Sequence, residues 1–321
     1  MRKLIASALL ASTAVLCGTA NAADIFPTRA IRLIVPFAPG GSTDASARML
    51  ATAMSQHLGQ PVVVENKAGG GANIGTEFVA RSAPDGYTIL LASPTTAINM
   101  AIYKNPPFNL KKDFVPVAEF GTSTVVLLVN DKFPARTLAE LIALCKKNPD
   151  KYFFASAGTG SLTHLTGELF NESAGIKVHH VPYKGAGPAM TDVAGGQAQM
   201  LFGLEVGAGA LMQAGKLIPL AVSGKQRLPD LPHVPTLDEA GVHGVDVDSW
   251  YGILAPARTP PEVVVKLEQA IALSTKDIDS KLSAVGILPE MVGSQAFAKR
   301  LDEQVEMWKK AVKTSHTPMQ D

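Results

Sequence analysis

The 321-residue sequence predicts an α/β fold, and three observations indicate it. Short runs rich in Val, Ile and Leu alternate with helical patterns of about ten to fifteen residues, the order typical of parallel sheets covered by helices. One strand–turn–helix pattern occurs twice, about 120 residues apart. After the first 22 residues, no apolar run approaches the length of about 18 residues that a membrane-spanning helix needs.

The chain begins with the features of a cleavable export signal, predicted for residues 1–22. Arg2 and Lys3 precede an apolar stretch, and the small residues at 20–22 resemble a cleavage site. Without this segment the chain has 27 basic and 28 acidic residues, and this near-neutral charge argues against a nucleic-acid partner. Cys145 then stands alone, so no intramolecular disulfide is expected and we predict a buried structural thiol.

The predicted elements follow in order along the mature chain. Apolar runs predict buried strands at residues 31–37, 62–65, 88–92, 125–129, 152–155 and 217–222. Apolar residues three or four apart predict helices, with the stripes Ala47, Leu50, Met54 and Leu58; Leu162, Leu165 and Leu169; Val264, Leu267 and Ile271; and Phe297, Leu301, Val305, Trp308 and Val312.

The repeated pattern is a strand, a turn of small residues with Ser or Thr, and a helix. The first copy covers strand 31–37, turn 38–43 and a helix from Asp44, and the second covers strand 152–155, turn 156–161 and a helix from Leu162. In open α/β sheets, ligands bind beyond the carboxyl ends of strands, where such turns lie. One copy in each domain would therefore form a cleft.

The chemistry of these turns favours an anionic ligand without any Lys or Arg. Glycines let the backbone approach closely, and the first N–H groups of a helix lack internal partners and carry partial positive charge. Ser42, Thr43, Thr159 and Ser161 add hydroxyl groups. The alternative is that these residues merely cap helices. For Asp44, capping is favoured over direct contact, because a carboxylate in the first turn of a helix would repel an anionic ligand. A ligand that carries an amine would be the exception.

The mature chain resembles the Bug-type extracytoplasmic receptors of tripartite tricarboxylate transporters. The resemblance covers nearly the whole mature chain and rests on seven segments in a fixed order. They are VPFAPGGSTD at 35–44, VENKAGGGANIG at 64–75, PDGYT at 84–88, GTGS at 158–161, VPYKG at 181–185, AGGQ at 194–197 and SWYG at 249–252.

The resemblance implies a two-lobed periplasmic-binding-protein fold of the type II, Venus-flytrap kind, with two crossover segments. We place the crossovers near residues 121–125 and 245–251, with domain 1 formed by 23–124 and 248–321 and domain 2 by 125–247. By matching position, the ligand-binding residues would be Phe37, Ala38, Gly40, Gly41, Ser42, Asp44, Ser93, Thr95, Gly158, Thr159, Ser161, His164, Tyr183, Lys184 and Phe202.

One segment departs from the family pattern. Where relatives commonly carry Phe followed by Asp or Asn, this chain reads Phe202-Gly203-Leu204-Glu205. The group that meets the distal end of a ligand therefore differs here. For Glu205 itself, a solvated or lobe-bridging carboxylate is favoured over a contact with a ligand amine.

Other functional patterns in the chain are weaker. The glycines at 69, 71 and 75 are spaced one residue too far for a dinucleotide fingerprint, and residues 209–216 fit a helix end and turn better than a phosphate loop. His179 and His180 are adjacent on a strand and face opposite sides, which disfavours a shared metal. Ser161 and His164 leave a low-ranked exported hydrolase open.

The sequence therefore predicts a periplasmic solute-binding receptor and not an enzyme, with no cofactor and no catalytic or metal site. Expected partners are a small organic carboxylate (a di- or tricarboxylate, an amino acid or an aromatic acid) and membrane transporter subunits. A receptor that signals to a membrane sensor is the alternative. We expect a monomer.

Overall fold

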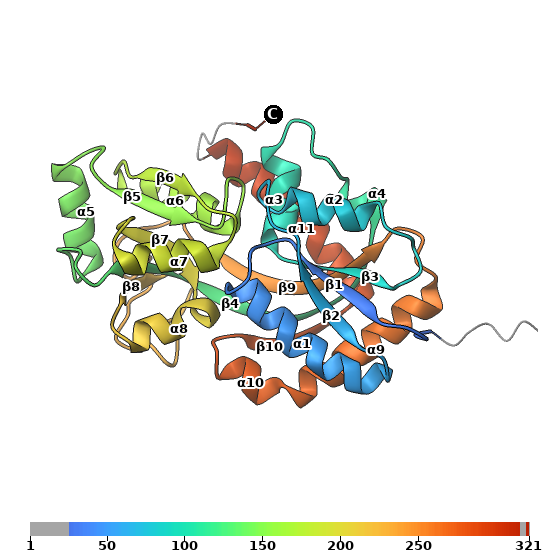
Figure 1. Cartoon of the computed structure of the whole chain (residues 1–321). Coiled ribbons are helices and arrows are strands. Elements are labelled where there is room, and N and C mark those ends of the chain that lie inside the picture. Colours follow the sequence, from blue (N-terminus) through green and yellow to red (C-terminus); the bar gives the residue numbers. More distant parts are fainter. Residues whose placement is uncertain (1–25, 315–318, 321) are drawn as a thin grey trace, which may run out of the picture.

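A computed structural model describes residues 26–314 and 319–320, so the expected export signal lies outside the described residues. The chain forms two lobes, each built on its own sheet, with strands that run from one lobe into the other (Figure 1). The first lobe holds both ends of the described chain, and the second lies in the middle of the sequence. The two-lobed α/β prediction is confirmed.

Lobe 1 begins with three parallel strands and the helices that connect them. Its first elements are β1 (Ile31–Val35), α1 (Ser42–Leu58), β2 (Val62–Asn66), α2 (Asn73–Ala80), β3 (Thr88–Ala92) and α3 (Pro94–Ile102). Both β2 and β3 pair in parallel with β1, one on each side. Because crossovers between parallel strands are right-handed, α1 and α2 lie on opposite faces of the sheet. The carboxyl end of β1 is thus a topological switch point, where ligands bind.

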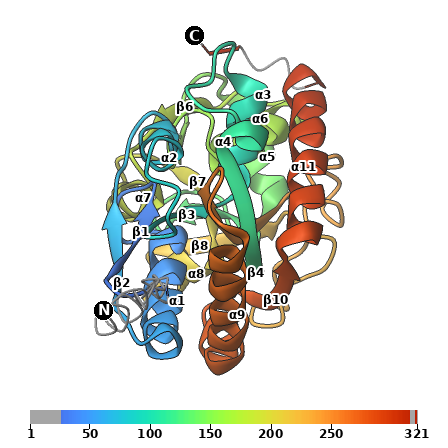
Figure 2. The ribbon, with the colours of Figure 1, turned by 90° about the vertical axis from the view of Figure 1, so that its right-hand side faces the viewer.

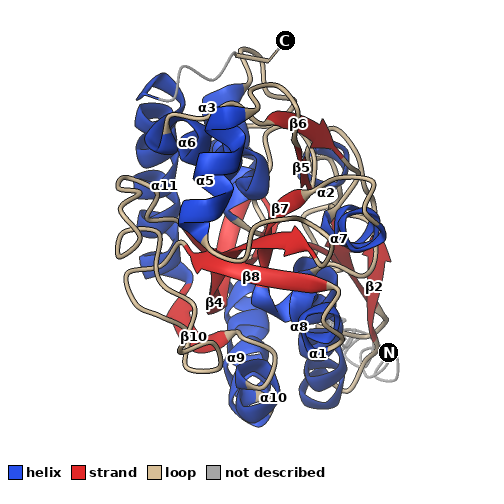
Figure 3. Cartoon of the chain, turned by 90° about the vertical axis from the view of Figure 1, so that its left-hand side faces the viewer, coloured by secondary structure: helices blue, strands red, loops and turns tan. Residues whose placement is uncertain are grey.

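Lobe 2 repeats this topology. Its elements are β5 (Phe153–Ser156), α6 (Leu162–Ala174), β6 (His179–Pro182), α7 (Ala186–Gly195), β7 (Met200–Leu204) and α8 (Glu205–Gln213). The three strands belong to the second sheet, and the helices lie around it (Figure 3). Both β6 and β7 pair in parallel with β5, one on each side. The carboxyl end of β5 is therefore the equivalent switch point of lobe 2.

Two long antiparallel strands join the lobes. Strand β4 (Phe114–Asn130) pairs with β9 (Asp248–Pro256) up to the pair Thr124–Asp248, and from Val125 onward it pairs with β7 and β8 (Leu217–Val222). A single strand therefore belongs to both sheets. The change of partners falls inside the expected first crossover, and β9 begins inside the second.

The remaining helices and strands complete the two lobes. They are α4 (Leu110–Asp113), α5 (Leu138–Lys147), α9 (Pro261–Asp277), α10 (Asp279–Ser283), β10 (Leu288–Gly293) and α11 (Ser294–Thr314). Helix α9 packs beside α1, while α11 packs beside α3 and against β4 (Figure 2). The predicted stripes lie on the buried sides of α1, α6, α9 and α11. Cys145 is buried in α5, as predicted.

The expected strands differ from the observed ones at their edges. β1 ends at Val35, because Pro36 has no N–H to continue a ladder. β2 lies at the edge of its sheet and is half exposed, so the expectation of a buried strand was wrong there. β4 extends far beyond the expected 125–129. Its lobe 1 half was not predicted, because Pro116, Glu119 and Thr122 interrupt the apolar pattern there.

Candidate binding site

The starts of helices from both lobes surround one small cavity between the lobes. α1 and α3 come from lobe 1, and α6, α7 and α8 come from lobe 2. The cavity has a volume of about 40 Å³, so a bound solute would contact both lobes at once. Its lining residues are Phe37, Ala38, Gly41, Ser42, Thr43, Asp44, Ser93, Thr95, Ala157, Ser161, Leu162, Thr163, Ala186, Leu204 and Ser249.

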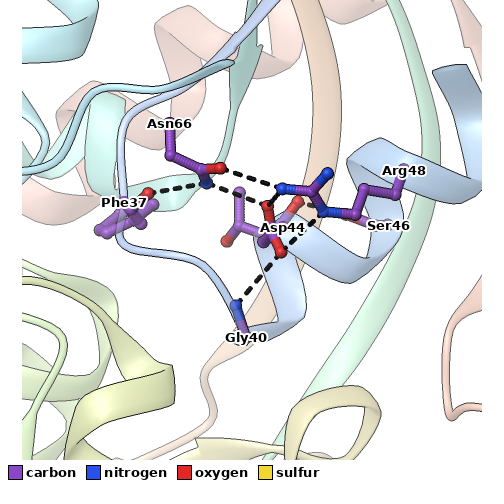
Figure 4. A network of polar contacts seen from close by, with 7 residues as sticks. Phe37, Gly40, Asp44, Ser46, Arg48 and Asn66 are labelled. Atoms are coloured by element: carbon purple, nitrogen blue, oxygen red, sulfur yellow. Dashed lines mark hydrogen bonds and ion pairs between the residues drawn. The ribbon is translucent and has the colours of Figure 1, made fainter. Parts of the chain in front are cut away.

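Asp44 anchors the first turn. Its carboxylate accepts hydrogen bonds from the Gly40 N–H (3.2 Å), from Nδ2 of Asn66 (2.9 Å) and from the Arg48 guanidinium, whose Nε and Nη2 lie 3.0 and 2.9 Å away (Figure 4). Nδ2 of Asn66 also donates to the Phe37 carbonyl. These contacts fix the path of the chain from the end of β1 to the start of α1.

The same contacts decide the charge of Asp44. Burial opposes ionisation of its carboxyl, but the hydrogen bonds from Arg48, Asn66 and the Gly40 N–H outweigh burial and hold the pKa below its ordinary value. The carboxylate is therefore ionised and occupied by protein partners. This geometry favours the anchoring role over direct contact with an anionic ligand.

The second turn is organised by hydroxyl groups at the start of α6. The Ser161 hydroxyl accepts the His164 backbone N–H and lies 3.1 Å from the Thr163 hydroxyl. The Thr163 hydroxyl in turn accepts the Ala157 N–H, at 2.9 Å. Ser161 thus caps the helix, and both residues also line the cavity.

The buried His164 and the half-buried His180 support the second turn from behind. His164 Nδ1 accepts the Gly160 N–H (3.2 Å), and Nε2 of His180 lies 2.6 Å from the Ser156 hydroxyl. The two rings face each other with centroids 4.0 Å apart. Burial lowers the pKa of His164 to about 4, and burial together with His164 lowers that of His180 to about 3. Both rings are therefore neutral near neutral pH and act as hydrogen-bonding supports.

Two hydrogen bonds from backbone N–H groups join the lobes beside the cavity. The Ala38 N–H in lobe 1 donates to the Lys184 carbonyl in lobe 2, at 3.0 Å. The Leu162 N–H at the start of α6 donates to the Thr95 hydroxyl in α3, at 3.2 Å. The structure is thus a closed form, in which the two repeated turns face each other.

The expected site residues fall into three groups: cavity lining, outer grooves and positions behind the site. Eight of them line the cavity: Phe37, Ala38, Gly41, Ser42, Asp44, Ser93, Thr95 and Ser161. Gly40 and Tyr183 border an outer groove on one side of the lobe interface, and Gly158, Thr159, Tyr183 and Lys184 border another. His164 lies behind the second turn, and Phe202 packs on Phe170 in the core of lobe 2.

Sequence reasoning missed several lining residues. Leu204, Ala186 and Ser249 lie at the start of α8, at the start of α7 and in β9. Ser249 and Ala186 stand inside or beside segments already matched to the family, so their position was a usable signal. Leu204 belongs to the segment 202–205 that departs from the family pattern, so that departure was its signal, although strand β7 was not predicted.

The helix starts around the cavity give it the chemistry of an anion site without basic side chains. Among the described residues that line it, the only charged side chain is that of Asp44, which Arg48 and Asn66 already occupy. Helix starts present N–H groups and the positive end of the helix dipole. The arrangement therefore fits an anionic group held between the lobes. In the described part of the chain, no cluster of three or more His, Cys, Asp or Glu residues could hold a metal ion.

Glu205 bridges the lobes outside the cavity lining. It is buried at the start of α8, and a Cβ added at Gly286 of lobe 1 would lie 2.5 Å from its carboxylate oxygen. Burial raises the pKa of Glu205, and Asp230 raises it further. The lobe-bridging interpretation of Glu205 thus agrees with its position.

The sequence matches a family model described as the Tripartite tricarboxylate transporter family receptor over residues 46–316. It is 37% identical over 290 residues to the protein BugT of Bordetella pertussis, covering 89% of each chain. No helix among the described residues combines the length and the apolar character that crossing a membrane requires.

Solved structures share the fold over nearly the whole chain. The periplasmic binding protein BugD is 35% identical, with a TM-score of 0.89 over 92% of this chain and 100% of its own. An R. palustris protein with adipate is 34% identical (TM-score 0.87, 91% and 98% covered). MatC from Rhodopseudomonas palustris with bound malate is 32% identical (TM-score 0.86, 89% and 100% covered).

Proposed function

Because the chain belongs to the tripartite tricarboxylate transporter receptor family, we propose that it is a periplasmic receptor that captures a small carboxylate between its lobes for a membrane transporter. The observation that carries this proposal is the convergence of five helix starts on one cavity that has no basic side chain among its described lining residues. Similar structures with malate and with adipate support a carboxylate as the ligand.

The strength of such a site is sufficient for micromolar binding. Each hydrogen bond to a charged group contributes roughly 1.5–3 kcal/mol, and a favourable helix start adds up to about 2 kcal/mol. Micromolar affinity corresponds to roughly 8 kcal/mol. Two or three charge-assisted bonds from each turn therefore meet this requirement after the cost of ordering the ligand.

The proposed site consists of the cavity lining and the residues that hold it. Direct contacts are assigned to the hydroxyl residues Ser42, Thr43, Ser93 and Ser161 of the cavity lining. Thr95 also lines the cavity and is assigned to lobe closure, because its hydroxyl accepts the Leu162 N–H. Asp44 and His164 are assigned positioning roles behind the two turns. Gly40, Gly158 and Lys184, which border the outer grooves, are assigned to closure of the lobes.

The proposed domains follow the change of strand partners. Domain 1 comprises residues 23–124 and 248–321, and domain 2 comprises residues 125–247. The pairing of β4 with β9 ends at Thr124–Asp248, and pairing with β7 begins at Val125, which supports this division. Export by residues 1–22 to the periplasm belongs to the same proposal.

A hydrolase is disfavoured by the partners of Ser161 and His164. Ser161 accepts the backbone N–H of His164, and the ring Nδ1 of His164 is occupied by the Gly160 N–H. The Ser161 hydroxyl is therefore not bonded to a base that would take its proton. Unchanged ester hydrolysis in Ser161→Ala relative to wild type is the expected control result.

The test is thermal unfolding of the mature protein with a panel of small acids. A ligand that binds only the folded form raises the melting temperature by mass action. We expect a rise with at least one free acid, such as malate or adipate, and no rise with its amide or ester. In protein refolded to remove co-purified ligand, no shift with any acid would contradict the carboxylate proposal.

Experiments in cells distinguish the transport hypothesis from the signalling hypothesis. Deletion of the gene should abolish uptake of the identified acid if the receptor serves a transporter. Normal uptake combined with a lost transcriptional response to that acid would favour the sensor alternative.

A further inference from the structure

A glycine-rich loop outside the cavity lining contacts the opposite lobe. This glycine loop, residues 69–72, connects β2 to α2 and lies in the segment whose spacing did not fit a dinucleotide site. All four residues have positive φ, at 129°, 58°, 57° and 76°. Such a run favours glycine strongly, because side chains rarely adopt this backbone conformation.

Gly71 lies against the second turn of lobe 2. A Cβ placed on Gly71 would lie 2.0 Å from the carbonyl oxygen of Thr159, closer than any real contact of this kind. The contact is mutual, because a Cβ on Gly158 would lie 3.6 Å from Cα of Gly71. Only glycine at position 71 therefore lets the two backbones meet in the closed form.

Asn99 of α3 holds the glycine loop in this position. Its Nδ2 donates to the Gly71 carbonyl at 2.9 Å and to Oδ1 of Asn73 at 2.8 Å. Asn99 is fully buried, and its Oδ1 would lie 3.1 Å from a Cβ on Gly160 of lobe 2. The loop is thus fixed by lobe 1 and presented to lobe 2.

We propose that the glycine loop is a latch that stabilises lobe closure, with Gly71 as the residue that admits the Thr159 carbonyl. This proposal rests on the proposed function, because a latch serves only a receptor whose lobes open and close. The latch contacts involve protein atoms alone. They therefore favour the closed form both with and without a ligand, and a ligand adds its own contacts to them.

The test compares Gly71→Ala with Gly59→Ala. Gly59 has a similar φ of 66°, but a Cβ there meets nothing within 4 Å, so it shares the backbone strain without the clash. Spin labels at Gln56→Cys in α1 and Lys147→Cys in α5 report the distance between the lobes. Both positions are exposed, and the native Cys145 is buried and protected from labelling.

In Gly71→Ala, we expect a shift of the ligand-free distance distribution toward the open form. With a binding acid, we expect at least tenfold faster ligand dissociation than in wild type. Gly59→Ala should close and release ligand as wild type does. Asn99→Ala, which frees the loop without adding an atom, should shift the distances in the same direction and provides the second variant if Gly71→Ala does not fold.

The outcomes separate the two proposals. Equal ligand-free distances in wild type, Gly71→Ala and Asn99→Ala would overturn the latch, whatever the ligands do. If no acid of the panel changes the wild-type distances while the ligand-free distances still differ, the latch stands and the carboxylate proposal fails.

Discussion

Among single residues, Asp44 has the clearest measurable role. Asp44→Asn keeps the shape of the side chain but removes the charge that holds Arg48, Asn66 and the Gly40 N–H. We expect a loss of roughly 1–3 kcal/mol in unfolding free energy. We also expect about tenfold weaker ligand binding, because the first turn is no longer fixed. Thermal unfolding and titration calorimetry measure the two effects.

The control for Asp44 is Asp85→Asn. Asp85 forms an exposed ion pair with Arg29 at 3.0 Å, which contributes little to stability. Because the pKa of Asp44 is lowered in the folded state, its contribution is present at neutral pH and is lost as the pH falls through that lowered pKa. A stability difference between wild type and Asp44→Asn that persists unchanged in acid would contradict this role.

Glu119 gives a second prediction for a single residue. It is fully buried in β4, and burial raises its pKa to about 7, against the attraction of Arg300 at 2.7 Å. That close pair lacks hydrogen-bond alignment, so burial prevails. The folded state therefore binds more protons than the unfolded state between about pH 4.5 and 7. Stability should fall as the pH rises through this window, and Glu119→Gln should remove that decline.

Chemical unfolding at several pH values measures this effect. The exposed Glu290 lies 3.8 Å from Arg300, and its charge also raises the pKa of Glu119. Glu290→Gln should therefore move the decline in stability to lower pH without abolishing it. An equal slope of stability against pH in wild type and Glu119→Gln would show that Glu119 titrates normally.

For the elements, the predictable part of the fold was the set of apolar runs. β1, β3 and β8 and the stripes of α1, α6, α9 and α11 follow simple periodicity. Long-range pairing determined the rest. β9 contains Ser249, Trp250 and Gly252 and reads as no regular pattern, yet it is buried between β3 and β4. Such a strand is specified by its neighbours more than by its own residues.

The cavity lining was predictable where a turn follows a strand directly. Glycines and hydroxyl residues mark the turns after β1 and β5 in the sequence, and both turns line the cavity. The start of α8 carries no such sign, because Leu204 and Glu205 resemble an ordinary strand end. Its place at the cavity follows from the repeated topology, in which α8 corresponds to α3.

The contact between helix starts makes a third prediction. In the closed form, the Leu162 N–H of α6 donates to the Thr95 hydroxyl of α3. Thr95→Val preserves the side-chain shape and leaves this N–H without its partner only when the lobes close. An unpaired buried donor costs roughly 1–3 kcal/mol, so ligand affinity should fall about tenfold or more. The melting temperature without ligand should change little.

The control is Thr52→Val on α1. Its hydroxyl bonds the Arg48 carbonyl within the same helix and is exposed, so affinity should be retained. Equal affinities in Thr95→Val and wild type would show that the contact does not contribute to closure.

Over the whole molecule, we expect closure to connect ligand binding to pH through Glu205. The closed lobes bury its carboxylate beside Gly286, and burial raises its pKa, with Asp230 acting in the same direction. Closing therefore takes up protons, and ligand affinity should increase as the pH falls toward the ordinary glutamate value. In Glu205→Gln this increase should be smaller by the contribution of one proton. The ligand's own titration cancels in the comparison, and an identical pH dependence in both proteins would refute this coupling.

The shared strand β4 also determines how the gene can be rearranged. Thr124 and Asp248 are cross-strand partners in an antiparallel ladder, so the chain leaves lobe 1 and returns to it at adjacent points. Antiparallel neighbours can be joined by a turn of about two residues. The chain between these two residues therefore has the geometry of an insertion, which agrees with the proposed domains. A chimaera that exchanges residues 125–247 between relatives keeps every backbone pair between β4 and β9, and we expect such exchanges to change the ligand preference.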